Sequence, residues 1–265
     1  MTMFSAILPP NYEMARKQGS KSSATAAATD LGNDMILLDA FLSVDECRAW
    51  ISWGENYHNE EKDTTATGMT GFVSCSQEAT NEYAFRRQSR LEIDSADIAN
   101  SIFTRLSLCN AIPATMEGLV PHSCMKNIRL YKYAQGDAFG KHIDESHQTS
   151  PGCFSEFTCL IYLNGDGYNT MKSFREYDEN GLCGVMGGAT AFYTSHSSML
   201  PFVTVAPQVG RCLLHAHGHR CLTHEAQPVL EGTKYVLRTD VVYSIGTQKK
   251  EMKTTTKKKK KKKEK

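Results

Sequence analysis

The chain has 265 residues, enough for one large domain or two small ones, and 40% of them are hydrophobic. No run of about 18 apolar residues occurs, so the sequence excludes a membrane-spanning helix. The formal net charge is +1, but residues 249–265 hold eleven Lys and two Glu, a net of +9. The other 248 residues hold 19 basic and 27 acidic side chains, a net of −8. An acidic body therefore carries a basic tail.

The cysteines and the N-terminus point to an intracellular protein. The nine cysteines are an odd number without a Cys-x-x-Cys pair, which argues against a secreted disulfide framework. Residues 1–8 lack the charged segment that begins a secretory signal peptide, so we expect none. Residues 14–29 are rich in Ser and Ala with a few basic residues, which leaves mitochondrial targeting as the alternative to a disordered leader.

Composition divides the chain into three zones. Residues 1–32 are small and polar and predict a disordered leader. Residues 33–247 carry the periodic signals of one folded domain. Residues 248–265 predict a disordered Lys-rich tail, because like charges repel and Met252 is the only apolar side chain there.

Two helices are expected in the first half of the domain. Ser43 and Glu46 have the spacing of a capping box, and Asp94 or Ser95 can cap a second helix. The apolar residues at helical spacing after these caps are Val44, Cys47, Trp50 and Ile51 in the first helix, and Ile98, Ile102 and Leu106 in the second. Residues 55–85 between them show no clear period and predict a long loop.

From residue 127 the pattern changes to short β-prone runs separated by Gly, Pro, Asn and Asp. These runs are Asn127–Tyr133, Phe157–Leu163, Ala189–Tyr193, Phe202–Val205, Arg211–His215 and Lys234–Tyr243. Such a series predicts an antiparallel sandwich or barrel such as a jelly roll. The fold class we expect is α+β, with a jelly-roll (double-stranded β-helix) core from about residue 127 and the helices of the N-terminal half packed on one sheet.

His142 and Asp144 form the first chemical motif. In a strand these two side chains lie on one face, about 6–7 Å apart along the backbone. A neutral imidazole and a carboxylate so placed can ligate one metal, and a second His would complete the 2-His-1-carboxylate set of non-haem Fe(II) oxygenases. The motif is short enough to arise by chance, so it indicates a metal site only if the sequence also offers a third ligand.

Four His between residues 215 and 224 are candidates for that ligand. One interpretation is that His215, His217 and His219 share a strand face and bind a metal by themselves. The other is that only His224 binds and that the first three belong to a surface turn around Gly218, which is the favoured interpretation. Ten residues beyond His224, Lys234 begins a strand whose alternate residues face the interior. A buried Lys needs an anion, and a dicarboxylate co-substrate would supply one.

Taken together, these segments resemble the prolyl 4-hydroxylase-like, Fe(II)- and 2-oxoglutarate-dependent dioxygenases. The resemblance covers about residues 33–245 and is strongest from residue 127; a less specific part is the Arg86–Asp94 stretch. The matching stretches are Arg129–Asp144, Phe157–Asn164, Gly187–Tyr193, Val205–Pro207 with Gly210, and His224–Tyr243.

The resemblance implies a role for each matched residue. His142, Asp144 and His224 would hold Fe(II) as the catalytic centre. Lys234 would pair with the distal carboxylate of 2-oxoglutarate, and Tyr133, nine residues before His142, would hydrogen-bond the same group.

Two positions leave alternatives open. Tyr131 lies on the same strand face as Tyr133 and is the alternative phenol. Arg238 is a further candidate for the cofactor site, but it lies about 13 Å past Lys234 along the strand. It would therefore face the iron end, the substrate mouth or Asp240 rather than the same carboxylate.

The function implied is hydroxylation of a C–H bond, on a peptidyl proline of a protein or peptide substrate, with release of succinate and CO2 and with ascorbate as a further cofactor. Alternatives are the same iron chemistry on a small molecule or methylated nucleobase, a zinc cupin-like hydrolase, and a catalytically silent jelly-roll binding protein. The silent protein is disfavoured because all three ligands and Lys234 occur together.

The seven consecutive lysines at 257–263 predict a separate role for the tail. They suit a nuclear address read by an import receptor, or general affinity for nucleic acid or an acidic protein. A merely solvated tail is the alternative. We therefore expect a nuclear or cytoplasmic protein, with mitochondria as the other location.

Overall fold

The computed structural model describes residues 6–10, 27–57, 71–167, 182 and 184–246. The α-helices of this part are α1 (Val44–Asn56) and α2 (Ala96–Leu108), and Gly218–Arg220 forms a 3-10 turn. The strands are β1 (Ala28–Gly32), β2 (Met35–Leu38), β3 (Val73–Gln77), β4 (Arg86–Asp94), β5 (Leu119–Cys124), β6 (Asn127–Tyr133), β7 (Ala138–His142), β8 (Gln148–Ser150), β9 (Cys153–Tyr162), β10 (Val185–Gly187), β11 (Thr190–Tyr193), β12 (Val203–Val205), β13 (Cys212–Ala216), β14 (Thr223–Ala226), β15 (Val229–Gly232) and β16 (Lys234–Ile245).

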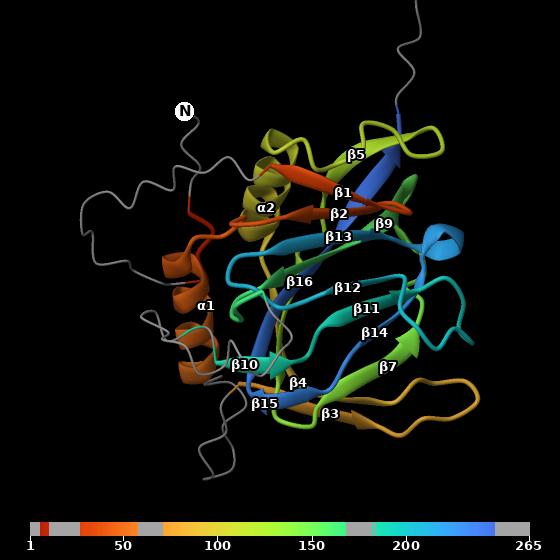
Figure 1. Cartoon of the computed structure of the whole chain (residues 1–265). Coiled ribbons are helices and arrows are strands. Elements are labelled where there is room, and N and C mark those ends of the chain that lie inside the picture. The colour runs from red at the N-terminus through yellow and green to blue at the C-terminus, as the bar shows by residue number, and fades with distance from the viewer. Residues whose placement is uncertain (1–5, 11–26, 58–70, 168–181, 183, 247–265) are drawn as a thin grey trace, which may run out of the picture.

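The strands form two antiparallel layers that face each other (Figure 1). The first layer has the order β13-β9-β16-β6, and the second has the order β7-β14-β11-β12. The pair β10 and β15 extends the second layer past β11 and β14. From β6 to β16 the chain passes repeatedly between the layers, which is the topology of a jelly roll. The predicted double-stranded β-helix core is confirmed.

Strand β4 joins the two layers at one edge. It pairs with β6 of the first layer through residues 89–94 and with β7 of the second through Arg86 and Arg87. The sheet therefore wraps around the interior between the two layers. This interior contains the site described below.

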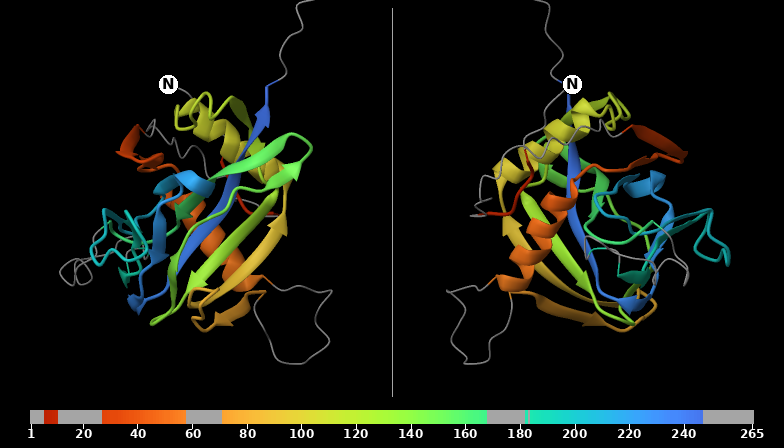
Figure 2. Two further views of the ribbon diagram at one scale, coloured as in Figure 1. Left: turned by 90° about the vertical axis from the view of Figure 1, so that its right-hand side faces the viewer. Right: turned by 60° about the vertical axis from the view of Figure 1, so that its left-hand side comes forward.

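The two helices cover the outer face of the first layer (Figure 2). Trp50 of α1 and Ile102 of α2 are fully buried and share one apolar cluster with Leu130 and Leu237 of the sheet. The predicted packing of N-terminal helices on one sheet is thus confirmed. None of the helices that the structure describes has the length and apolar character needed to cross a bilayer.

The helix starts agree with the caps expected from the sequence. Ser43 and Glu46 form a complete capping box, with Ser43 Oγ accepting from the Glu46 N–H and the Glu46 carboxylate accepting from the Ser43 N–H. Of the two residues considered for the second helix, Ser95 is the N-cap.

The first half of the domain contains more β-structure than expected. Five strands, β1 to β5, precede residue 127, and β3 lies inside the predicted loop 55–85. They were missed because they are short or polar: β4 reads RRQSRLEID, in which Gln88 and Leu91 are buried and the other positions are half-buried or exposed. Polar joining strands of this kind lack the apolar period that marks a core strand.

Two stretches of the predicted leader 1–32 belong to the fold. Ile7 is 1% exposed, its N–H donates to Glu46 Oε1 at 2.6 Å, and its carbonyl accepts from Trp50 Nε1 at 3.0 Å. Residues 28–32 form β1. The rest of the leader to residue 26 and the predicted tail 248–265 lie outside the described residues.

Candidate active site

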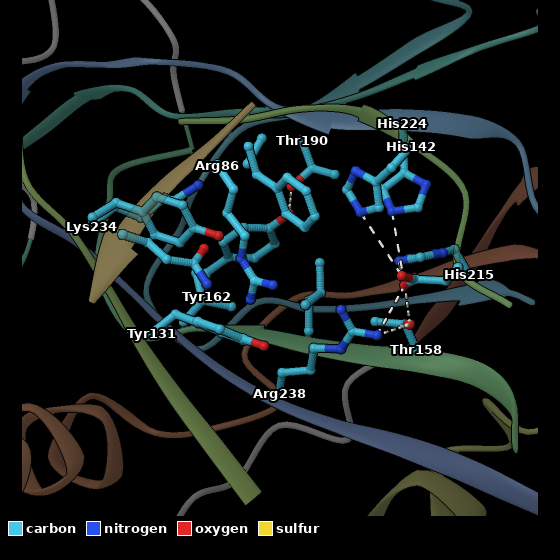
Figure 3. Close-up of a pocket in the computed structure, with 17 residues that line it drawn as sticks. Arg86, Tyr131, His142, Thr158, Tyr162, Thr190, His215, His224, Lys234 and Arg238 are labelled. Atoms are coloured by element: carbon cyan, nitrogen blue, oxygen red, sulfur yellow. Dashed lines mark hydrogen bonds and ion pairs between the residues drawn. The ribbon is translucent and has the colours of Figure 1, made fainter. Parts of the chain in front are cut away.

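A pocket between the two layers gathers the polar residues of the interior (Figure 3). Its walls come from β6, β9, β13 and β16 on one side and from β7, β11 and β14 on the other. His142 and His224 lie at one end, and Lys234 lies at the other. The pocket therefore has two chemically different ends.

The three predicted metal ligands meet at the first end. β7 and β14 are paired with His142 opposite His224, so the two imidazoles lie side by side with ring centroids 4.2 Å apart. Asp144 follows two residues after His142. Its Oδ1 is 3.8 Å from His142 Nε2, and its Oδ2 is 3.8 Å from His224 Nε2. Ligand atoms of the three residues all lie within 4.8 Å of one another, which is the arrangement required to share one ion.

The tautomers of the two imidazoles suit metal binding. His142 Nδ1 lies 2.8 Å from the Gly140 carbonyl, and His224 Nδ1 lies 3.0 Å from the Leu222 carbonyl. Each Nδ1–H can donate to its carbonyl, which leaves the Nε2 lone pair directed inward. Burial lowers the pKa of both rings, that of His142 to about 3, with the neighbouring imidazole as a further cause for His142. Both rings are therefore neutral ligands at neutral pH.

The carboxylate of Asp144 is held ionised from its other side. Arg238 Nη2 donates to Asp144 Oδ2 at 3.1 Å, and Thr158 Oγ1 donates to the same oxygen at 2.5 Å. Arg238 Nε also donates to Asp240 Oδ1 at 3.2 Å. Burial alone would raise the pKa of Asp144, but the Arg238 guanidinium and the imidazoles hold it well below its usual value. Of the three surroundings considered for Arg238, the structure places it at the metal end and beside Asp240.

Lys234 at the second end is 1% exposed. Its Nζ donates to the Gly188 carbonyl at 2.7 Å and lies 4.3 Å from the centre of the Tyr133 ring. Burial lowers its pKa to about 7, and its hydrogen-bond partner among the described residues is a neutral carbonyl rather than a carboxylate. An ammonium with unused N–H donors in a closed apolar site fits an anionic ligand.

Tyr133 is connected to the pocket mouth through strand β4. With its amide oriented as the neighbouring donors and acceptors require, Gln88 donates to the Tyr133 hydroxyl and accepts from Arg86. The Arg86 guanidinium lies 4.8 Å from the centre of the Phe139 ring, which stacks on His142. Tyr131 also lines the pocket, so both phenols considered from the sequence face the interior.

The sequence did not identify several pocket residues. Arg86 and Gln88 were noted only as part of a resembling stretch, because nothing local shows that β4 joins the two layers. Thr158 carried no motif, although its alternation within the Phe157–Leu163 run places it on the inner face. Tyr162 and Thr190 also line the pocket and had no role assigned from the sequence.

The His cluster is divided by the structure. His215 and His217 are each 2% exposed, so the interpretation as a surface turn is wrong for both. His219 is exposed in the 3-10 turn, 2.9 Å from Glu117, and this interpretation is correct for it. The three rings do not converge, so a metal site made of them is not formed. Instead, His215 joins His224 and Cys221 in a group whose ligand atoms lie within 4.8 Å.

No family model matches the chain, and no curated protein matches its sequence. Among solved structures, it is similar to the viral collagen prolyl hydroxylase vCPH from Paramecium Bursaria Chlorella virus-1, in complex with 2OG. The TM-score is 0.49 and the identity 16%, over 80% of this chain and 97% of that chain. It is also similar to a Trichoplax adhaerens prolyl hydroxylase in complex with a hypoxia inducible factor peptide fragment, with a TM-score of 0.49 and 16% identity over 79% and 83% of the two chains. A prolyl-4-hydroxylase from Pseudomonas putida has a TM-score of 0.46 and 16% identity over 78% and 91%. At this identity, the function has to follow from the residues of the site itself.

Proposed function

We propose that the protein is an Fe(II)- and 2-oxoglutarate-dependent dioxygenase that hydroxylates a C–H bond. One observation carries the proposal: two neutral imidazoles and an ionised carboxylate converge at one end of a pocket, and its other end holds a buried Lys that pairs with no carboxylate of the described part of the chain. Two His and one carboxylate are the ligand set of non-haem Fe(II) oxygenases, because they leave coordination positions open.

The residues at the second end fit the distal carboxylate of 2-oxoglutarate. Lys234 would bind it as a point charge, and the Tyr133 hydroxyl would add a hydrogen bond. The hydroxyl groups of Thr190 and Tyr162 form a hydrogen bond of 2.6 Å, and both residues line the pocket. With Fe(II) bound, the centre would use O2 as the oxidant: one oxygen atom would enter succinate as 2-oxoglutarate loses CO2, and the other would enter the hydroxyl group of the product. The protein would contribute the fixed ligands, the anion site and a pocket between the two layers that joins them.

The substrate we propose is a peptidyl residue, most simply a proline. A groove beside His142 runs between residues 79–85 and 140–143 and continues to His196 and Thr223. An open groove that reaches a metal ligand can receive an extended chain, whereas a small molecule would need only the closed pocket. Ascorbate is proposed as the reductant that keeps the iron in the Fe(II) state.

The experiment is a turnover assay on the full-length protein loaded with Fe(II). Succinate should form from 2-oxoglutarate, faster with ascorbate, and a peptide library should contain products heavier by one oxygen. His142→Ala should lose both the bound metal and the turnover, while His122→Ala, which changes an exposed His, should keep both. Absence of succinate in the metal-loaded wild type would overturn the proposal.

Lys234→Ala tests the second end separately. It should raise the KM for 2-oxoglutarate by at least about tenfold, because a charge-assisted contact is lost, and leave metal content unchanged. An unchanged KM would mean that 2-oxoglutarate does not contact Lys234.

A further inference from the structure

His215 is a third imidazole at the metal end of the pocket, outside the proposed ligand set. It lies on β13, which pairs with β2 on one side and with β9 on the other, and its side chain points between the layers (Figure 3). Its ring meets Phe192 edge to face at 5.3 Å and lies 4.5 Å from the ring of His224. These contacts fix the ring beside the ligands.

Both ring nitrogens of His215 lack a hydrogen-bond partner among the described residues, although the side chain is 2% exposed. Its neighbour His217 is equally buried, yet its Nδ1 lies 3.1 Å from the Ser155 carbonyl and its Nε2 lies 2.8 Å from Thr158 Oγ1. Burial in this part of the chain therefore does not by itself leave an imidazole ring without hydrogen-bond partners. A buried polar group without a partner is costly and indicates a missing one.

The missing partner has to lie at the metal end. His215 Nε2 is 3.8 Å from Asp144 Oδ2, which is too long for a hydrogen bond, and that oxygen already accepts from Thr158 and Arg238. The atom is as close to the Asp144 carboxylate as the Nε2 atoms of His142 and His224 are. It therefore faces the volume in which an ion and the groups bound to it would lie.

We propose that His215 binds the co-substrate, by donating a hydrogen bond from its ring N–H to the carboxylate of 2-oxoglutarate that lies on the metal. The inference rests on the proposed function. With His142, Asp144 and His224 as the ligands, the remaining positions on the metal would serve the co-substrate and O2, so we assign His215 to the co-substrate rather than to the metal. The co-substrate would then be recognised at both ends, by Lys234 at one carboxylate and by His215 at the other.

The test uses the full-length protein loaded with Co(II), so that binding is measured without turnover. Calorimetry gives the Kd of Co(II) and, on the loaded protein, the Kd of 2-oxoglutarate. His215→Phe should weaken 2-oxoglutarate binding by about tenfold, because a hydrogen bond to a charged group is lost. The Kd of Co(II) should change less than about twofold, since no ligand is removed.

Matched variants keep the result interpretable. His215→Gln retains an N–H donor and should recover part of the lost affinity, and the exposed His219→Ala should behave as wild type. If His215→Phe does not fold, His215→Leu replaces it as the apolar variant.

Three results would overturn the inference. If 2-oxoglutarate binds the apolar variant as tightly as wild type, His215 does not contact it. If the Co(II) affinity falls by tenfold or more, His215 is a metal ligand. If the Co(II)-loaded wild type does not bind 2-oxoglutarate at all, the proposed function fails together with the inference, which separates this outcome from the first two.

Discussion

Lys234 shows how one buried residue can make binding depend on pH. Burial lowers its pKa to about 7, so the side chain changes charge close to neutrality. In the proposed complex the carboxylate of 2-oxoglutarate would pair with the protonated form of Lys234, so binding would take up a proton wherever the free Lys is neutral. The Kd of 2-oxoglutarate on the Co(II)-loaded protein should therefore increase as pH rises above about 7. Calorimetry between about pH 6 and 8.5 measures this, and a flat profile would contradict it.

Burial of the Lys234 ammonium should also lower the free energy of unfolding. Its pKa is lower in the folded than in the unfolded chain, so the unfolded chain binds one more proton between about pH 7 and 10.5 and stability rises with pH through that window. Below pH 7 the full burial cost is present. Lys234→Met should raise the free energy of unfolding by about 1–3 kcal/mol at neutral pH and by less at pH 9. Urea unfolding measures both values, and destabilisation at pH 7 would show that the ammonium is compensated.

A substitution of Thr158 tests, without a change of charge, whether the hydrogen bond to Asp144 contributes to metal binding at the proposed site. Its hydroxyl donates to Asp144 Oδ2 and also lies 2.8 Å from His217 Nε2. Thr158→Val keeps the shape but leaves the carboxylate with one fixed donor fewer. The affinity for Co(II) should fall by about tenfold, the lower end of what such outer contacts contribute. Thr149→Val changes an exposed residue and should have no effect; equal affinities for the two variants would contradict the role.

At the scale of elements, helix α1 is tied to α2 by a buried ion pair. Arg105 Nη2 donates to Glu46 Oε1 at 2.8 Å, and the same carboxylate caps α1 and accepts from Ile7. Glu46→Ala should lower the free energy of unfolding by about 3–5 kcal/mol, because it leaves a buried guanidinium uncompensated.

The exposed pair between Asp45 and Arg48, in the same helix turn, is the matched control. Asp45→Ala should cost less than about 1 kcal/mol. Thermal and urea unfolding measure the stability of the two variants. Similar losses in the free energy of unfolding would mean that burial does not increase the contribution of the Glu46–Arg105 pair to stability.

At the scale of the whole molecule, charge separates the tail from the catalytic body. Residues 1–248 carry −8 and residues 249–265 carry +9. We propose that the tail directs the protein to its compartment or partner by charge, through an import receptor, nucleic acid or an acidic protein. Deleting residues 249–265 should abolish salt-dependent retention on a polyanion column and leave succinate formation unchanged. A loss of turnover would mean that the tail helps to form the site.

The sequence by itself determined the local features. The cap at Ser43, the helical spacing of the apolar residues after it and the β-prone runs of β6, β9 and β16 follow from interactions between residues close in sequence. The need for glycine at positions 187 and 188 is also a local feature. Their φ values of 76° and 68°, where the chain passes from β10 to β11, are ones that residues with a Cβ rarely adopt.

Only the tertiary structure decided which distant residues share the pocket. Arg238 contacts Asp144, ninety-four positions away in the sequence, because the pairing of β16 with β9 places Arg238 beside the end of the pocket where Asp144 lies. Arg86 and Gln88 enter the pocket because β4 bridges the layers, and His215 faces it because β13 lies opposite β9 in one register rather than the next. A shift of one residue would turn each side chain to the other face. Register and layer packing depend on the whole chain, so no local pattern could have revealed them.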